Sequence, residues 1–227
     1  MEVLSPTVVF SGSFSTTFNN WSEISNMHGN SCWIVPYNYS GIHWPGESKN
    51  RNKAYFTSSC LDGGIHMRQD MNKFRIQSAS VEFLALNGIS DHLDIGIQST
   101  FTPGVSITGY FAILGYDARL GGGLRLGIEK ASADGKNNWL HSGKSITLDA
   151  KKVYRIQIRT DQYPNKICAI AKLFRYESSK WSLLATTNYD DFFGDSDGDP
   201  LKGGVVWFGA VNQSNPIYFD HFRVEWY

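Results

Sequence analysis

Aromatic side chains in the first quarter of the chain are the residues with the clearest chemical use. The stretch 16–52 is rich in Asn and Ser and lacks regular alternation, yet it carries several Trp and Tyr residues. Exposed aromatic rings stack on sugar rings, while Asn, Asp and Arg side chains bind hydroxyl groups. The candidate stacking residues are Trp33, Tyr37, Tyr39 and Trp44, followed by Trp139 in a Gly-Lys-Asn-Asn-Trp turn, and Trp21. Core packing or loop anchoring is the alternative interpretation of each.

An acidic segment, residues 190–200, is a candidate metal-binding loop. Its alternating acids, which match the first ligands of an EF-hand loop, are Asp195, Asp197 and Asp199. The match then fails, because Pro200 stands where that loop needs Gly and Val206 stands where it needs Glu. We therefore interpret the segment as a solvated acidic turn and keep a different Ca²⁺ loop as the alternative.

The sequence lacks the motifs of several common classes of enzyme. The six His residues show no His-x-His or His-Glu-x-x-His spacing, which argues against a zinc enzyme. There is no Gly-x-Ser-x-Gly elbow and no phosphate-binding loop; Gly121-Gly122-Gly123 reads as a bend between strands. No residue is assigned a catalytic role.

Composition limits the class of partner. Lys plus Arg and Asp plus Glu are both 21, and no basic run occurs, so the chain lacks the basic face that nucleic-acid binding requires. No apolar run reaches the ~18 residues of a membrane-spanning helix. Aromatic residues make up 14% of the chain, which suits both a β-sheet protein and a sugar binder.

The sequence predicts that the elements that position these residues are strands. Apolar residues alternate with polar ones in many short runs, as in Leu93, Ile95 and Ile97, and in Tyr154, Ile156 and Ile158. Further strand-like runs are Thr7–Phe14, Cys32–Val35, Lys53–Thr57, Ile65–Arg68, Phe74–Leu86, Ile107–Tyr116, Leu124–Ile128, Ser145–Leu148, Ile167–Tyr176, Trp181–Thr186, Gly204–Val211 and Ile217–Trp226. Turn residues separate the runs and no helical period intervenes, which predicts two packed antiparallel sheets in one domain, residues 1–227.

The last strand carries a family resemblance. Phe219-Asp220-His221-Phe222-Arg223-Val224 resembles the closing strand of concanavalin A-like (laminin G-like) jelly rolls, which typically reads Phe-Asp-Asn-Phe-Arg-Val. The Gly-Gly-Val-Val-Trp-Phe-Gly run that ends at Gly209, and the Val-Tyr-Arg-Ile-Gln-Ile run that starts at Val153, fit the same order. The resemblance spans nearly the whole chain and implies an all-β, two-sheet jelly-roll sandwich; residues 16–52 have no equivalent in it.

Asp220 is a second candidate metal ligand. Strand alternation places it on the face of Phe222 and Val224, which in this family points inward. A buried carboxylate must be paired, hydrogen-bonded or bound to a metal. In many jelly rolls of this family the matching Asp helps to hold a structural Ca²⁺, so the resemblance implies a possible Ca²⁺ here. An Asp that only accepts backbone hydrogen bonds is the alternative.

The resemblance favours recognition over cleavage. Retaining glycosidases with this fold carry a Glu-x-Asp-x-(x)-Glu strand, and none of the seven Glu residues has that spacing. We therefore predict a carbohydrate-binding or lectin-like module for a polysaccharide or glycan, and lean against an enzyme. The alternatives are a glycoside hydrolase or polysaccharide lyase with a non-standard site, and a protein–protein adhesion domain. The sequence does not indicate an oligomeric state.

The cysteines and the N-terminus bear on location. Cys32 and Cys60 both lie in the loop-rich N-terminal third and could form a disulfide, which would leave Cys168 as a buried thiol in a strand. The first residues lack a basic region followed by an apolar run, so either the protein is not exported or a leader has been removed. We expect an extracellular or cell-surface protein.

Overall fold

The computed structural model describes residues 7–12, 21–24, 33–38, 52–56, 62–67, 76–102, 106–116, 122–131, 137–150, 152–194, 201, 205–211, 213, 215 and 217–226. These residues form fifteen strands in two antiparallel sheets, and no helix occurs among them. Nor, consequently, does this part of the chain hold a helix long and apolar enough to cross a membrane. The predicted all-β, two-sheet architecture is confirmed.

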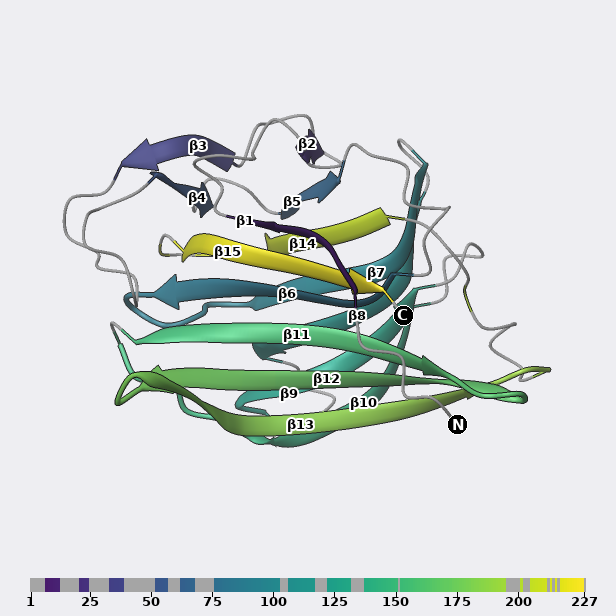
Figure 1. Cartoon of the computed structure of the whole chain (residues 1–227). Helices are drawn as coiled ribbons and strands as arrows, with labels where there is room; N and C mark the ends of the chain where they lie inside the picture. Colours follow the sequence, from purple (N-terminus) through teal and green to yellow (C-terminus); the bar gives the residue numbers. More distant parts are fainter. Residues whose placement is uncertain are drawn as a thin grey trace.

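One sheet has eight strands. In spatial order they are β13 (Lys180–Phe192), β12 (Lys166–Glu177), β11 (Val153–Gln162), β6 (Ile76–Ala85), β15 (Ile217–Trp226), β4 (Asn52–Phe56) and β3 (Trp33–Asn38), with β1 (Thr7–Gly12) also paired to β15. Strands β4 and β1 share one edge of β15, because β4 pairs with its first residues and β1 with its last. The first and last strands of the chain therefore lie side by side (Figure 1).

The other sheet has seven strands. Their order is β10 (Asn137–Ser145), β9 (Leu124–Ala131), β8 (Ser106–Tyr116), β7 (His92–Thr102), β14 (Val205–Val211), β5 (Asp62–Met67) and β2 (Trp21–Ile24). Strands β11, β12 and β13 cross the front of the view in Figure 1, with β9 and β10 behind them.

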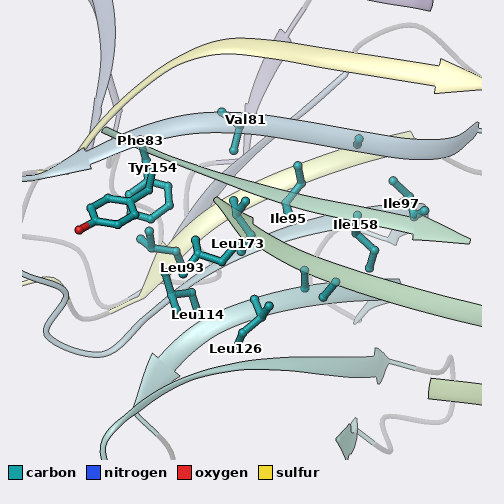
Figure 2. Packing of buried hydrophobic residues seen from close by; sticks show 14 of the residues in the cluster. Val81, Phe83, Leu93, Ile95, Ile97, Leu114, Leu126, Tyr154, Ile158 and Leu173 are labelled. Atoms are coloured by element: carbon teal, nitrogen blue, oxygen red, sulfur yellow. The ribbon is translucent and has the colours of Figure 1, made fainter. Parts of the chain in front are cut away.

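The core lies between the two sheets and follows the predicted alternation. Ile156 and Ile158 of β11 and Ile95 and Ile97 of β7 are all at most 1% exposed and pack in one cluster. Figure 2 shows side chains of both sheets meeting there, among them the rings of Phe83 and Tyr154, whose centroids are 5.6 Å apart. Burial of this apolar surface is the main stabilising contribution to the sandwich.

Three sequence-based boundaries need correction. The predicted strand Ser145–Leu148 is wrong after its first residue, because β10 ends at Ser145 and residues 146–149 belong to no strand. Strand β13 runs to Phe192 rather than stopping at Thr186, since it stays paired with β12 along its full length. A strand at Trp21–Ile24 also lies inside the stretch that had no regular alternation.

Glycine conformations fit the predicted bend before β9. Gly122 and Gly123 have φ angles of 74° and 79°, in the left-handed region that side chains with a Cβ avoid. The chain can therefore reverse there and enter β9 at Leu124.

Candidate functional site

The candidate site lies on the face of the seven-stranded sheet that points away from the core, called the outer face below. Neighbouring strands place six positions opposite one another in one row across the sheet. The row is His66, Trp207, Gly96, Phe111, Glu129 and Trp139. Ile95 and Ile97, on either side of Gly96, point into the core, so the row belongs to the opposite face. Phe111 and Trp207 pack there with Ile113 and Ala131 in a cluster separate from the core.

Trp207 and Asp94 form the polar centre of the outer face. The indole N–H of Trp207 donates a hydrogen bond to Oδ1 of Asp94 at 2.9 Å. Trp207 is 5% exposed, whereas Asp94 is only half-buried. This bond fixes the orientation of the carboxylate, which remains partly open to solvent as a hydrogen-bond acceptor.

Gly96 makes room for the ring of Phe111. A Cβ at this position would overlap the Phe111 ring and lie 3.0 Å from the hydroxyl oxygen of Ser99. Ser99 is 2% exposed, and its hydroxyl has no hydrogen-bond partner within the described part of the chain. A buried hydroxyl without a partner carries a free-energy cost that a ligand hydroxyl or a water molecule would relieve.

Charged groups on the outer face are mainly acidic among the described residues. Asp94 and Glu129 contribute carboxylates, while the Arg125 guanidinium donates to the backbone oxygens of Gly122 at 3.2 Å and Gly143 at 2.9 Å. The rings of Phe111 and Trp207 are themselves buried, so what this face offers a ligand with many hydroxyls is its carboxylate acceptors. The two carboxylates sit on β7 and β9, with β8 between them, and their positions are offset by two residues along the strands, so their backbones are about 12 Å apart.

Comparisons with known proteins identify the fold. No family model matches the sequence, and neither does any curated protein. Solved structures do match. The exoplasmic/lumenal domain of VIP36, in a Ca²⁺/Man3GlcNAc-bound form, aligns with a TM-score of 0.55 and 9% identity over 92% of this chain and 84% of that one. Peanut lectin aligns with a TM-score of 0.50 and 12% identity over 98% and 97%. A legume lectin-like domain from Entamoeba histolytica aligns with a TM-score of 0.51 and 8% identity over 99% and 98%. The chain is a concanavalin A-like jelly roll.

The jelly roll does not bring the predicted stacking residues together. Trp33 and Tyr37 lie on β3, an edge strand of the eight-stranded sheet, whereas Trp21 and Trp139 lie on the two end strands of the other sheet. Tyr39 and Trp44 lie outside the described residues. Trp139 was expected in a turn, but it pairs with Glu129 inside β10, because that strand already begins at Asn137.

Sequence reasoning missed Trp207, Asp94 and Phe111. Trp207 and Phe111 stand in apolar strands, so their types suggested core packing, and Asp94 stood alone among apolar residues. The signal was present in the alternation itself: when Leu93 and Ile95 face the core, Asp94 must face the other side. The alternation does not reveal the order of the strands in the sheet, and it is this order that places the three residues together.

Asp220 is fully buried, as predicted, but on the opposite face of its sheet. It pairs with Glu82, and Glu82 is flanked along β6 by core residues, so both carboxylates point away from the core. An extra residue in β15 between Asp220 and Arg223 shifts the register and reverses the alternation, with His221 at φ 46°. The predicted sharing of a face with Phe222 is therefore wrong.

The carboxylate of Glu82 lies between the Arg155 guanidinium and the His221 imidazole. Oε1 lies 2.7 Å from an Arg155 nitrogen, and Oε2 lies 3.2 Å from Nδ1 of His221. Burial on its own raises the pKa of Glu82, but the hydrogen bonds and charges of His221 and Arg155 outweigh it and keep this pKa below its ordinary value. Among the described residues no group of three His, Cys, Asp or Glu side chains can hold a metal. Asp220 and Glu82 alone do not complete the six to eight oxygens that Ca²⁺ takes.

The structure describes only the first part of the acidic segment 190–200. Asp195, Asp197 and Asp199 lie outside the described residues. Asp191, expected in the same solvated turn, is instead fully buried in β13, with Oδ1 2.9 Å from the ammonium of Lys130 and Oδ2 accepting a hydrogen bond from Tyr110. Burial and the Asp191 carboxylate raise the pKa of Tyr110, which therefore stays protonated.

The cysteine predictions have different outcomes. Cys32 and Cys60 lie outside the described residues, so their disulfide stays a prediction. Cys168 is a free thiol in β12, as expected, but it is half-buried rather than buried. Burial and the neighbouring Asp190 raise the pKa of its thiol to about 11, so it is protonated at neutral pH.

Proposed function

We propose that this jelly roll binds a polysaccharide or glycan on the outer face of its seven-stranded sheet. The observation that carries the proposal is the Trp207–Asp94 hydrogen bond beside Phe111, which sets a half-buried acceptor among aromatic rings. The fold likeness to peanut lectin and to the Man3GlcNAc-bound VIP36 domain is consistent with this role.

Titration with a panel of oligosaccharides tests the proposal. Intrinsic Trp fluorescence or calorimetry should detect binding to at least one neutral oligosaccharide. Asp94→Asn should weaken that binding about tenfold, since it removes a charged acceptor while it preserves the volume of the side chain. Asp149→Asn is the matched control, because Asp149 is 51% exposed and pairs with Arg175 on the other sheet. Equal affinity of Asp94→Asn and wild type would contradict the assignment, and release of reducing ends from the panel would favour a hydrolase.

We further propose a structural Ca²⁺ at Asp220. The support is the complete burial of this carboxylate, since a metal ion is one way to stabilise a buried carboxylate, together with the fold likeness to the VIP36 domain in its Ca²⁺-bound form. Added CaCl₂ should raise the Tm of the wild type by several degrees relative to EDTA, because a ligand of the native state stabilises it by mass action. Asp220→Asn should abolish this difference; an unchanged difference would remove Asp220 from the site.

The remaining expectations stay predictions. They are an extracellular or cell-surface location and a single domain over residues 1–227.

A further inference from the structure

A cluster of exposed aromatic side chains lies on the eight-stranded sheet, away from the outer face of the other sheet. Among the described residues six large apolar side chains are at least 36% exposed, and three of them are Tyr163, Phe192 and Phe193. Tyr163 lies in the turn between β11 and β12, and the two Phe residues lie at the end of β13, which runs beside that turn. In Figure 1 these strand ends project beyond the rest of the eight-stranded sheet. We name these three residues the aromatic tip.

The aromatic tip is held in place by the backbone and by Lys166. The Tyr163 N–H donates to the carbonyl of Lys166 at 2.9 Å, and the Phe193 N–H donates to the carbonyl of Asn165 at 3.1 Å. The Lys166 ammonium is 5.4 Å from the ring centroids of both Tyr163 and Phe192, within the range of a cation–π contact. Rings fixed in this way lose little conformational entropy when a ligand stacks on them.

The described charges around the aromatic tip argue against an anionic partner. Lys166 is paired with Asp190 at 2.6 Å, and Arg159 with Asp161 at 2.6 Å, so these two cations of β11 and β12 are compensated. The chain continues directly from Phe193-Gly194 into Asp195, the first acid of the segment described above. Anionic lipids and nucleic acids need uncompensated Lys or Arg. A neutral polyol does not, and it uses aromatic faces together with carboxylate acceptors.

We propose that the aromatic tip is a second carbohydrate-contact surface, separate from the outer face, for a neutral polysaccharide. The proposal extends the proposed function to another part of the molecule. It predicts that a polymer gains affinity from the tip, whereas a short oligosaccharide bound on the outer face does not.

Depletion assays with insoluble cellulose, chitin, xylan and β-1,3-glucan test the proposal, with the soluble tetrasaccharides of the same series titrated in parallel. The variant Tyr163→Ser/Phe192→Ser should bind the preferred polymer about tenfold more weakly than the wild type and the tetrasaccharide equally well. The matched control is Tyr116→Ser, because Tyr116 is also a largely exposed ring, at 51%. It lies at the end of β8, where its N–H donates a hydrogen bond to the carbonyl of Asp91. Circular dichroism establishes that each variant is folded.

Failure of this proposal differs from failure of the proposed function. If the tip variant binds the polymer as the wild type does, or if the wild type binds none of the four polymers, the aromatic tip is not a carbohydrate surface. If Asp94→Asn leaves tetrasaccharide affinity unchanged while the tip variant loses polymer binding, the outer face is not the oligosaccharide site, and the aromatic tip is still supported as a carbohydrate surface. Sedimentation of the wild type, but not of the tip variant, with phosphatidylcholine vesicles would overturn the proposal in favour of a membrane contact.

Discussion

Lys130, Asp191 and Tyr110 form a buried polar group that joins the two sheets. Lys130 and Tyr110 belong to the seven-stranded sheet and Asp191 to the eight-stranded one, and all three are fully buried. The Tyr110 oxygen also accepts a hydrogen bond from the backbone N–H of Leu201 at 3.1 Å. Such a group is stable only while each member keeps its partner, because the cost of burying a charge is then offset.

Removal of one partner should therefore be costly. We expect Lys130→Met to lower the free energy of unfolding by about 3–5 kcal/mol, because it leaves the Asp191 carboxylate buried without its cation. Urea unfolding monitored by fluorescence measures the change. The double variant Lys130→Met/Asp191→Asn should recover part of the loss; a double variant less stable than the single one would show that the ion pair is not the cause.

Glu82 should make stability depend on pH. Its pKa is lower in the folded state than in the unfolded state, so the stability it contributes is present above the unfolded value and is lost as pH falls through the folded one. Urea unfolding between pH 7 and about pH 3 should show a smaller loss of stability in Glu82→Gln than in the wild type. Glu177→Gln, at a 36% exposed side chain, is the control and should follow the wild type. Parallel curves for Glu82→Gln and wild type would contradict the assignment.

At this scale the sequence indicated residue types but not their positions. It favoured exposed loop aromatics together with Asn, Asp and Arg side chains, whereas Trp207 and Asp94 meet because β14 and β7 are neighbours in the sheet. Residues this far apart in the sequence become neighbours only through the order of the strands in the sheet. Local sequence patterns do not reveal that order. The burial of Asp220 was predictable from its strand, but its face was not, since the extra residue in β15 changes no residue type.

Among the elements, β7 and β8 depend on a glycine for their close contact. Gly96→Ala should lower the free energy of unfolding by about 1–3 kcal/mol and weaken oligosaccharide binding, because the new Cβ displaces the Phe111 ring from the outer face. Thermal unfolding and the titration described above measure the two effects. Gly194→Ala is the comparison: nothing lies within 4 Å of its Cβ position and only its φ of 87° opposes a side chain. It should cost about 1 kcal/mol and leave binding intact; unchanged binding by Gly96→Ala would mean that Phe111 takes no part.

Strands with strict alternation were predicted well and those without it were not. Tyr154, Ile156 and Ile158 are buried as expected, because only one face of β11 meets the core. Strand β2 has four residues and β10 begins in a run of Asn, so neither carries the apolar period by which a strand is recognised. Pairing with β5 and β9 makes them strands, and that pairing is a property of the sheet.

For the whole molecule the pairing of β15 predicts an asymmetry between the two ends of the chain. A chain that stops before Ile217 loses the strand that separates β6 from β4 and β1, and we expect it not to fold. A chain that starts after Gly12 loses, among the described strands, only β1, whose one described partner is β15, and it should fold with reduced stability. Circular dichroism and resistance to trypsin distinguish the two; equal behaviour would contradict the central role of β15.

The extra residue in β15 determines how this strand responds to the deletion of a residue, as distinct from its replacement. Ile217 and Phe219 before it and Phe222 and Val224 after it all face the core, although the two pairs are out of phase. Deletion of His221 would remove the extra residue and make the alternation continuous, with Phe222 and Val224 still facing the core and Arg223 still opposite Ser80. In a library of variants this position should therefore tolerate deletion as well as substitution, whereas deletion of a residue elsewhere in β15 would turn part of the strand to the wrong face.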